Sequence, residues 1–201
     1  MFRKLIVASA VVAISSSPAF AGNYKGDYKG EAVPAPCATY NPAVAPYFGI
    51  SIGKQTTYSG SSRAYQGGNG TLSLGYGGIV APDWYLAGEV FVDGTVTFND
   101  SEQVNTLSLQ NNWSYGISII PGYMITSNLL GYLRVGGIET NFNETNGAWK
   151  SGWQVGVGGQ TNIAQNWDLR AEYVWTYYST FGARGRPLAD AVNLGLIYRF
   201  T

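Results

Sequence analysis

The sequence predicts an all-β fold, an eight-stranded antiparallel transmembrane β-barrel with short turns at one end and longer loops at the other. Three observations predict it. Residues 45–201 divide into eight runs with the two-residue period of a β-strand. The connections between these runs alternate between short and long. Charged residues form only 12% of the chain, about half the usual share of a soluble domain, whereas aromatic residues form 14%.

The N-terminus has the layout of a secretory signal peptide. Arg3 and Lys4 precede an apolar run at 5–14, and small residues flank Phe20 at the end of the segment. Such a peptide is removed from the exported protein, here after Ala21. We therefore expect residues 1–21 to be a cleaved signal peptide.

The segment 22–44 is expected to be a flexible tail because it contains several prolines and a short tandem repeat of polar residues. The barrel then occupies residues 45–201. Without Arg3 and Lys4, the chain has 10 basic and 12 acidic side chains, and the basic residues do not gather on one surface. Nucleic acid is therefore excluded as a partner.

Each of the eight runs places bulky apolar side chains on one face and small or polar side chains on the other. Along the chain, the apolar faces carry Phe48, Ile50 and Ile52; Leu72, Leu74 and Tyr76; Leu86, Val90 and Val92; Trp113, Tyr115, Ile117 and Ile119; Leu133 and Val135; Trp153, Val155 and Val157; Leu169, Ala171, Tyr173 and Trp175; and Val192, Leu194, Leu196, Tyr198 and Phe200. A soluble β-sandwich shows the same alternation. Its polar face would carry many charges, however, whereas here it carries mainly Gly, Ser, Thr, Gln and Asn, as expected of a narrow barrel interior.

The connections are asymmetric. Short ones fall at 81–83, 126–128 and 164–166, and longer polar ones are expected at 55–68, 94–112, 139–151 and 178–188. Short periplasmic turns and longer extracellular loops are typical of outer-membrane barrels. An even number of strands also returns the C-terminus to the side of the short turns.

Five charged residues on the polar faces are expected to form a paired network inside the barrel. Glu89, Arg134 and Glu172 each lie five positions after the start of a run, which places them at similar depth. Arg170 and Asp93 lie nearby on the same faces. Buried charges need partners, so the sequence predicts an interior charge network.

Aromatic residues are expected at two levels of the outer surface. Trp84, Tyr123 and Trp167 fall beside the short turns, and Trp113, Trp153, Trp175 and Tyr177 fall near the long loops. Two aromatic levels are typical of the girdles that mark the two membrane interfaces.

The signal peptide, the eight alternating segments and an apolar alternating C-terminus together resemble the small outer-membrane barrels of Gram-negative bacteria, a porin-like family that includes OmpA and OmpX. The resemblance covers residues 45–201. It implies that Leu194, Leu196, Tyr198 and Phe200 form a signal read by the barrel assembly machinery. It also implies contact with outer-membrane lipid and lipopolysaccharide. In this family the chain usually ends on the aromatic residue, whereas here Thr201 follows it.

The sequence contains no histidine. This excludes a Ser-His-Asp hydrolase, a Cys-His catalytic pair and a metal site with histidine ligands. We expect no catalytic, cofactor-binding or metal site. An enzyme based on carboxylates alone is the remaining catalytic alternative, with Glu89 and Glu172 or Asp93 as the pair, but these acids are expected to neutralise the arginines of the network. Cys37 is expected to be a free thiol.

Three functions remain for such a barrel. The first, which we favour, is a non-enzymatic structural and surface-interaction protein, acting in adhesion or envelope integrity through its extracellular loops. Arg63, Arg184 and Arg186 are its candidate contacts to acidic host or envelope groups. The second is a small passive pore, which side chains filling the interior would block. The third is a lipid-acting membrane enzyme.

Overall fold

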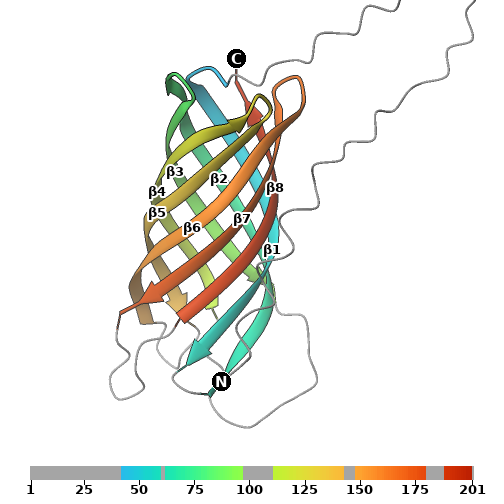
Figure 1. Ribbon diagram of the computed structural model, residues 1–201. Helices are drawn as coiled ribbons and strands as arrows, with labels where there is room; N and C mark the ends of the chain where they lie inside the picture. The colour runs from blue at the N-terminus through green and yellow to red at the C-terminus, as the bar shows by residue number, and fades with distance from the viewer. Residues whose placement is uncertain (1–41, 60–61, 97–110, 143–147, 180–187, 201) are drawn as a thin grey trace, which may run out of the picture. The chain divides into compact units, whose positions relative to one another are not determined.

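The computed structural model describes residues 42–59, 62–96, 111–142, 148–179 and 188–200, in which β-strands joined by short turns are the regular secondary structure. No helix among these residues is long and apolar enough to cross a membrane. Eight strands follow one another along the chain (Figure 1). They are β1 (Ala45–Ser59), β2 (Ser62–Ala81), β3 (Trp84–Val96), β4 (Asn111–Thr126), β5 (Leu129–Phe142), β6 (Ala148–Ala164), β7 (Trp167–Tyr178) and β8 (Leu188–Arg199).

The strands close into a barrel in sequence order. Every strand is antiparallel to its neighbours, and β1 closes the sheet by pairing with β8. Ile50, for example, pairs with Leu72 on one side and with Leu196 on the other. Closure leaves no sheet edge, as a strand-built membrane protein requires. The predicted fold class is confirmed.

Tight turns join the strands at one end of the barrel. They fall at 82–83, 127–128 and 165–166, where the sequence predicts short connections. Asp83 and Asn166 have φ angles of 63° and 64°, a left-handed conformation that short polar side chains tolerate best. The end of β8 lies at the same end of the barrel (Figure 1), where the Arg199 amide donates to the Asn166 carbonyl at 2.9 Å.

The strands at the opposite end extend further than the sequence predicts. The expected loop at 55–68 is mostly strand, because Gln55 pairs with Gly67 and the ladder continues to Ser59 and Ser62. The expected loop at 139–151 is likewise shortened by β5 and β6, which pair as far as Phe142 and Ala148. Both faces of these extensions carry many polar or small residues, so the alternation that marks a strand fades. Backbone hydrogen bonding continues regardless of this pattern.

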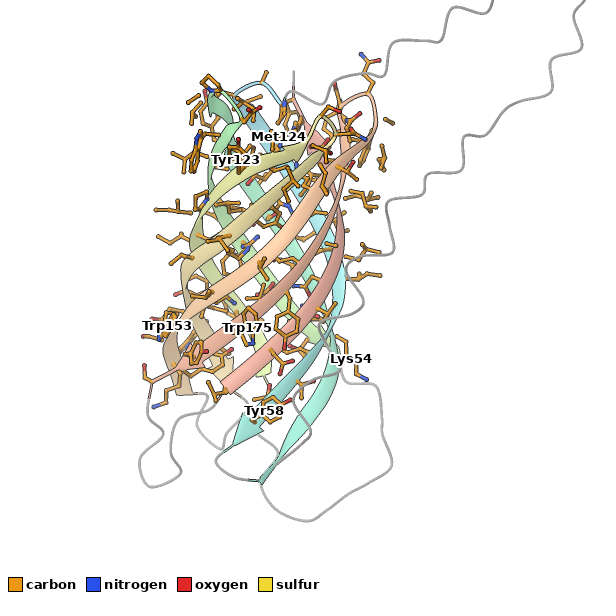
Figure 2. All side chains as sticks on the ribbon, viewed as in Figure 1. Lys54, Tyr58, Tyr123, Met124, Trp153 and Trp175 are labelled. Atoms are coloured by element: carbon orange, nitrogen blue, oxygen red, sulfur yellow. The ribbon has the colours of Figure 1, made fainter. Side chains whose placement is uncertain are left out.

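The barrel is apolar outside and polar inside. Ile117 on β4 is 66% exposed and Ile125 near the turn end is 64% exposed. Between Ile117 and Ile119, Ser118 points inward and is buried. The stick view shows side chains standing outward along the whole length of the wall (Figure 2). Such a surface is stable only against an apolar solvent, and lipid is that solvent.

Aromatic side chains form pairs at both ends of this outer surface. At the turn end the ring centroids of Trp84 and Tyr123 are 5.5 Å apart, and at the opposite end Trp153 stacks on Tyr177 at 4.4 Å. Figure 2 shows Tyr123 near one end, and Trp153 and Trp175 toward the other. Trp149, to which the sequence assigned no role, packs against Trp113.

The spacing of the two aromatic levels fits a bilayer. Trp167 and Tyr177 lie ten positions apart on β7. At about 3.3 Å per residue this is about 33 Å along the strand. A strand tilt of about 40° reduces it to about 25 Å along the barrel axis, the height of the apolar band of outer-membrane barrels.

We predict that Ile117→Arg destabilises the folded protein in lipid vesicles by about 2–4 kcal/mol, because it places a charge at the middle of the apolar band. The matched control is Ile125→Arg, which is equally exposed but lies beyond Tyr123 at the turn end. It should cost about 1 kcal/mol or less. Urea titration in vesicles measures both. Equal costs at the two positions would contradict the assignment of the band.

Candidate functional site

The lumen of the barrel contains a cluster of charged side chains from three strands. Glu89 comes from β3, Arg134 from β5, and Arg170 and Glu172 from β7. Strand alternation turns all four inward, and each is buried, with Glu89 only 3% exposed. The structure therefore brings together four of the five residues that the sequence placed in an interior network.

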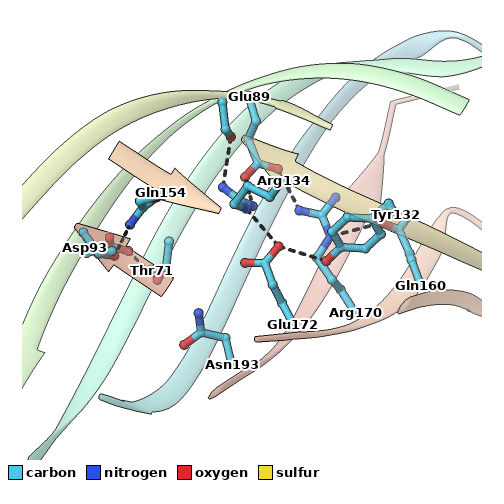
Figure 3. Close-up of polar contacts among 12 residues, drawn as sticks. Thr71, Glu89, Asp93, Tyr132, Arg134, Gln154, Gln160, Arg170, Glu172 and Asn193 are labelled. Carbon is cyan, nitrogen blue, oxygen red and sulfur yellow. Dashed lines mark hydrogen bonds and ion pairs between the residues drawn. The ribbon is translucent and has the colours of Figure 1, made fainter. Parts of the chain in front are cut away.

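Arg134 is the centre of this cluster (Figure 3). Its Nη2 donates to Glu89 Oε1 at 2.5 Å and its Nε to Glu172 Oε2 at 2.9 Å. Its Nη1 donates to Ser118 Oγ at 3.0 Å. Arg170 Nη1 completes the group by donating to Glu89 Oε2 at 2.7 Å. Two carboxylates thus balance two guanidinium groups.

Tyrosines supply the remaining hydrogen bonds of the two carboxylates. Tyr47 donates to Glu89 Oε2 at 2.9 Å, and Tyr132 donates to Glu172 Oε2 at 3.0 Å. The Arg170 guanidinium also lies against both rings, 5.5 Å from the centroid of Tyr47 and 5.4 Å from that of Tyr132. Such contacts stabilise a desolvated cation. Neither tyrosine is among the residues predicted for the network, although strand alternation places both on inward faces.

A second ion pair lies nearer the tight turns. Arg199 Nε donates to Asp168 Oδ2 at 2.8 Å, and Gln160 Nε2 donates to the same oxygen at 2.8 Å. Arg199 Nη2 also donates to the hydroxyl of Tyr85 at 3.3 Å. Gln160 links the two layers because its Oε1 accepts from Arg170 Nε at 3.0 Å. Alternation placed these residues on the inward faces, but it did not show that they would meet.

Asp93, the fifth residue predicted for the network, also lies in the lumen, but among the described residues it forms no ion pair with the other four. It lies four residues beyond Glu89 on β3, about 13 Å along the strand. It accepts a hydrogen bond from Thr71 Oγ1 at 2.5 Å. Figure 3 shows it beside Thr71 and apart from Arg134 and Glu172. A cavity of about 50 Å³ lies in the lumen, lined by Asp93 and Glu172 among others.

The remaining candidate residues lie on β8 or outside the described residues. Leu194, Leu196, Tyr198 and Phe200 line the outward face of the last strand and its end, and Leu194 and Phe200 are exposed. The side chain of Arg63 lies outside the described part of the chain. Arg184, Arg186 and Cys37 lie entirely outside the described residues.

The cluster is a network of ion pairs and hydrogen bonds between strands. The carboxylates of Glu89 and Glu172 each accept from an arginine and a tyrosine, so both are held as ion-paired acceptors. A general acid or base must instead reach a proton on a substrate. Within the described ranges, no group of three His, Cys, Asp or Glu side chains is arranged to hold a metal ion. The cluster joins β3, β4, β5 and β7 across the lumen.

A closed barrel with an apolar outer wall, two aromatic levels and a charged interior defines an outer-membrane β-barrel protein. The family model described as outer membrane protein beta-barrel domain matches residues 7–200. The chain therefore belongs to this family. Among curated protein sequences, none matches the chain.

Solved structures of small outer-membrane barrels resemble this fold. Neisserial surface protein A is 18% identical, with a TM-score of 0.55 over 77% of this chain and 97% of its own. Ail, the attachment invasion locus protein of Yersinia pestis, is 19% identical, with a TM-score of 0.52 over 78% of this chain and 99% of its own. At these identities the likeness shows the fold alone.

We predict that Glu89→Gln destabilises the barrel by about 3–5 kcal/mol, because it leaves the buried charges of Arg134 and Arg170 with one carboxylate between them. Urea titration in vesicles, followed by tryptophan fluorescence, measures the loss. The matched control is Glu139→Gln, which removes the same charge from an outward position beside Ser151. It should change stability by about 0.5 kcal/mol or less. Similar effects of the two variants would show that the network contributes nothing specific.

Proposed function

We propose that this protein is a non-enzymatic outer-membrane scaffold that makes surface interactions through its extracellular loops, in adhesion or envelope integrity. The observation that carries the proposal is the lumen, which is crossed by paired charges and tyrosines rather than left open. The ion pairs of Arg134 with Glu89 and Glu172 lie between opposite walls at mid-barrel. A rigid barrel without a substrate site leaves recognition to its loops, where binding residues commonly lie.

The outer surface gives the scaffold its membrane partners. Outer-membrane lipid and lipopolysaccharide contact the apolar wall and the aromatic levels. The barrel assembly machinery reads the last strand, where Leu194, Leu196 and Phe200 face outward. The tight turns face the periplasm, and the opposite end, where the longer connections lie, faces the outside. This orientation follows the asymmetry common to bacterial barrels.

The loop arginines supply the proposed contacts. Arg63, Arg184 and Arg186 lie in or beside connections at the end opposite the tight turns. Guanidinium groups suit carboxylate, phosphate and sulfate ligands because they donate several hydrogen bonds in a fixed plane. We therefore assign them to acidic groups of a host or envelope surface. The names of the two solved neighbours, a surface protein and an attachment protein, agree with a role of this kind.

Two other functions receive less support. A passive pore needs a continuous water path, whereas Arg134, Arg170 and the two tyrosines occupy the centre of the lumen. A lipid-acting enzyme needs reactive groups that can reach lipid, whereas the described carboxylates at mid-barrel lie inside and are ion-paired. The absence of histidine from the sequence removes the usual general base.

We predict that replacing Arg63, Arg184 and Arg186 together by Gln reduces binding of expressing cells to dextran sulfate-coated beads by roughly tenfold. Three charge contacts at about 0.5 kcal/mol each account for this factor. The binding of the parent protein should also weaken as salt is raised. Cell retention on the beads is the measurement.

The matched control is the double change Lys25→Gln and Lys29→Gln, which removes positive charge from the N-terminal tail. It should leave binding unchanged. An epitope inserted at 143–147 should be cut by protease added to intact cells, which tests the orientation separately. Unchanged binding of the arginine variant would exclude the loop contacts, whereas a protected epitope would overturn the orientation.

A further inference from the structure

Glu139 places a carboxylate on the outer wall of the barrel. It lies near the end of β5, at the loop end of the barrel, opposite the tight turns. Its neighbours Ile138 and Thr140 are buried, so alternation turns the Glu139 side chain outward, where it is partly exposed. Ser151 Oγ donates to its Oε1 at 2.5 Å, and no described cation forms an ion pair with it. A charge on a lipid-facing wall is costly without a partner.

The wall beside Glu139 contains an open recess. Gly137 lies on the same face of β5, two positions nearer the tight turns, and a Cβ built there would meet no other atom within 4 Å. Ile117 on β4 and Trp153 on β6 pair with it from the two sides. Trp153 is held by stacking on Tyr177 at 4.4 Å, and Figure 2 shows it toward the loop end. The glycine is therefore the floor of a recess between two bulky side chains.

Aromatic rings border this recess on the side of the loops. Tyr115 pairs with Glu139 from β4, and Trp149 pairs with Asn141 from β6. The centroids of these two rings are only 5.6 Å apart, so the rings meet over β5. Trp113 packs against Trp149 at 4.8 Å. Aromatic faces attract cations, so the rings and the carboxylate together favour a positively charged ligand.

Lys150 lies next to Ser151 on β6 but faces the other side of the sheet. It pairs with Thr140, which has no exposed surface, whereas Glu139 pairs with Ser151. Strand alternation therefore directs the Lys150 side chain into the barrel and the Glu139 side chain outward. The lipid side is the direction from which a cation can approach the outward carboxylate.

We propose that the recess binds one membrane lipid whose headgroup carries a primary ammonium group. The ammonium donates to the Glu139 carboxylate and contacts the rings beside it, and an acyl chain lies over Gly137. A primary ammonium has N–H donors for the carboxylate, whereas a choline headgroup has none. The site lies on the wall rather than in the loops. It therefore goes beyond the proposed function, and its failure would leave the loop contacts untouched.

The test places the purified folded protein in nanodiscs that contain equal amounts of phosphatidylethanolamine and phosphatidylcholine with the same acyl chains. Native mass spectrometry counts the lipids that stay bound. The parent protein should retain phosphatidylethanolamine roughly tenfold more than phosphatidylcholine, the factor expected of one charge-assisted hydrogen bond. Glu139→Gln should retain the two lipids equally, because the amide lacks the negative charge.

Two further variants separate the recess from a general effect of surface charge. Gly137→Leu fills the open space and keeps the carboxylate, so it should also lose the preference. Asp190→Asn is the matched control. It removes another carboxylate near the loop end, one that pairs with the exposed Trp175 and accepts from the Tyr173 hydroxyl at 2.9 Å. This control should keep the preference of the parent protein.

Each variant is compared with the parent protein only after it shows the gel mobility of a folded barrel. The proposal is overturned if the parent protein shows no preference for phosphatidylethanolamine, or if the preference persists in Glu139→Gln or in Gly137→Leu. Loss of the preference in Asp190→Asn would also overturn it, because the effect would then follow the charge of the rim and not this recess.

Discussion

The whole structure depends on the constraint that backbone polar groups inside a bilayer have no water to bond. A strand-built protein can meet this constraint only by closing its sheet, because each unpaired group in the apolar layer costs several kcal/mol. The pairing of β1 with β8 achieves the closure, for example between Ile50 and Leu196. Closure with eight strands then fixes a narrow lumen that side chains can fill.

The content of that lumen decides what the barrel does. Small residues leave room for a few large polar ones, and the large ones meet across the axis, with Arg134 between Glu89 and Glu172. Tyr47 and Tyr132 complete the hydrogen bonding and cover the Arg170 guanidinium. A lumen occupied in this way connects the walls, and the proposed function requires that it leaves no open passage. The outer wall faces lipid, so the loops become the part of the proposed scaffold that recognises other molecules.

The sequence predicted the parts of this structure that depend on residue periodicity. Alternation showed which side chains face inward, and turn residues such as Asp83 and Asn166 marked the tight end. It could not show which inward residues meet, because that depends on the tilt and stagger of strands far apart in the chain. Alternation therefore gave Asp93 an inward position without showing which side chain it contacts, and the pair of Asp168 with Arg199 was missed. Strand ends near the loops were also missed, since their polar sequence no longer alternates.

Conductance in planar bilayers tests most directly the central claim that paired charges close the lumen. The folded parent protein should give no current steps above background. A variant with Glu89, Arg134, Arg170 and Glu172 all replaced by Ser should conduct, provided that it shows the gel mobility of a folded barrel, because the groups that cross the axis have been removed. Regular current steps from the parent protein, similar in size to those of the variant, would contradict the account and make the barrel a small pore.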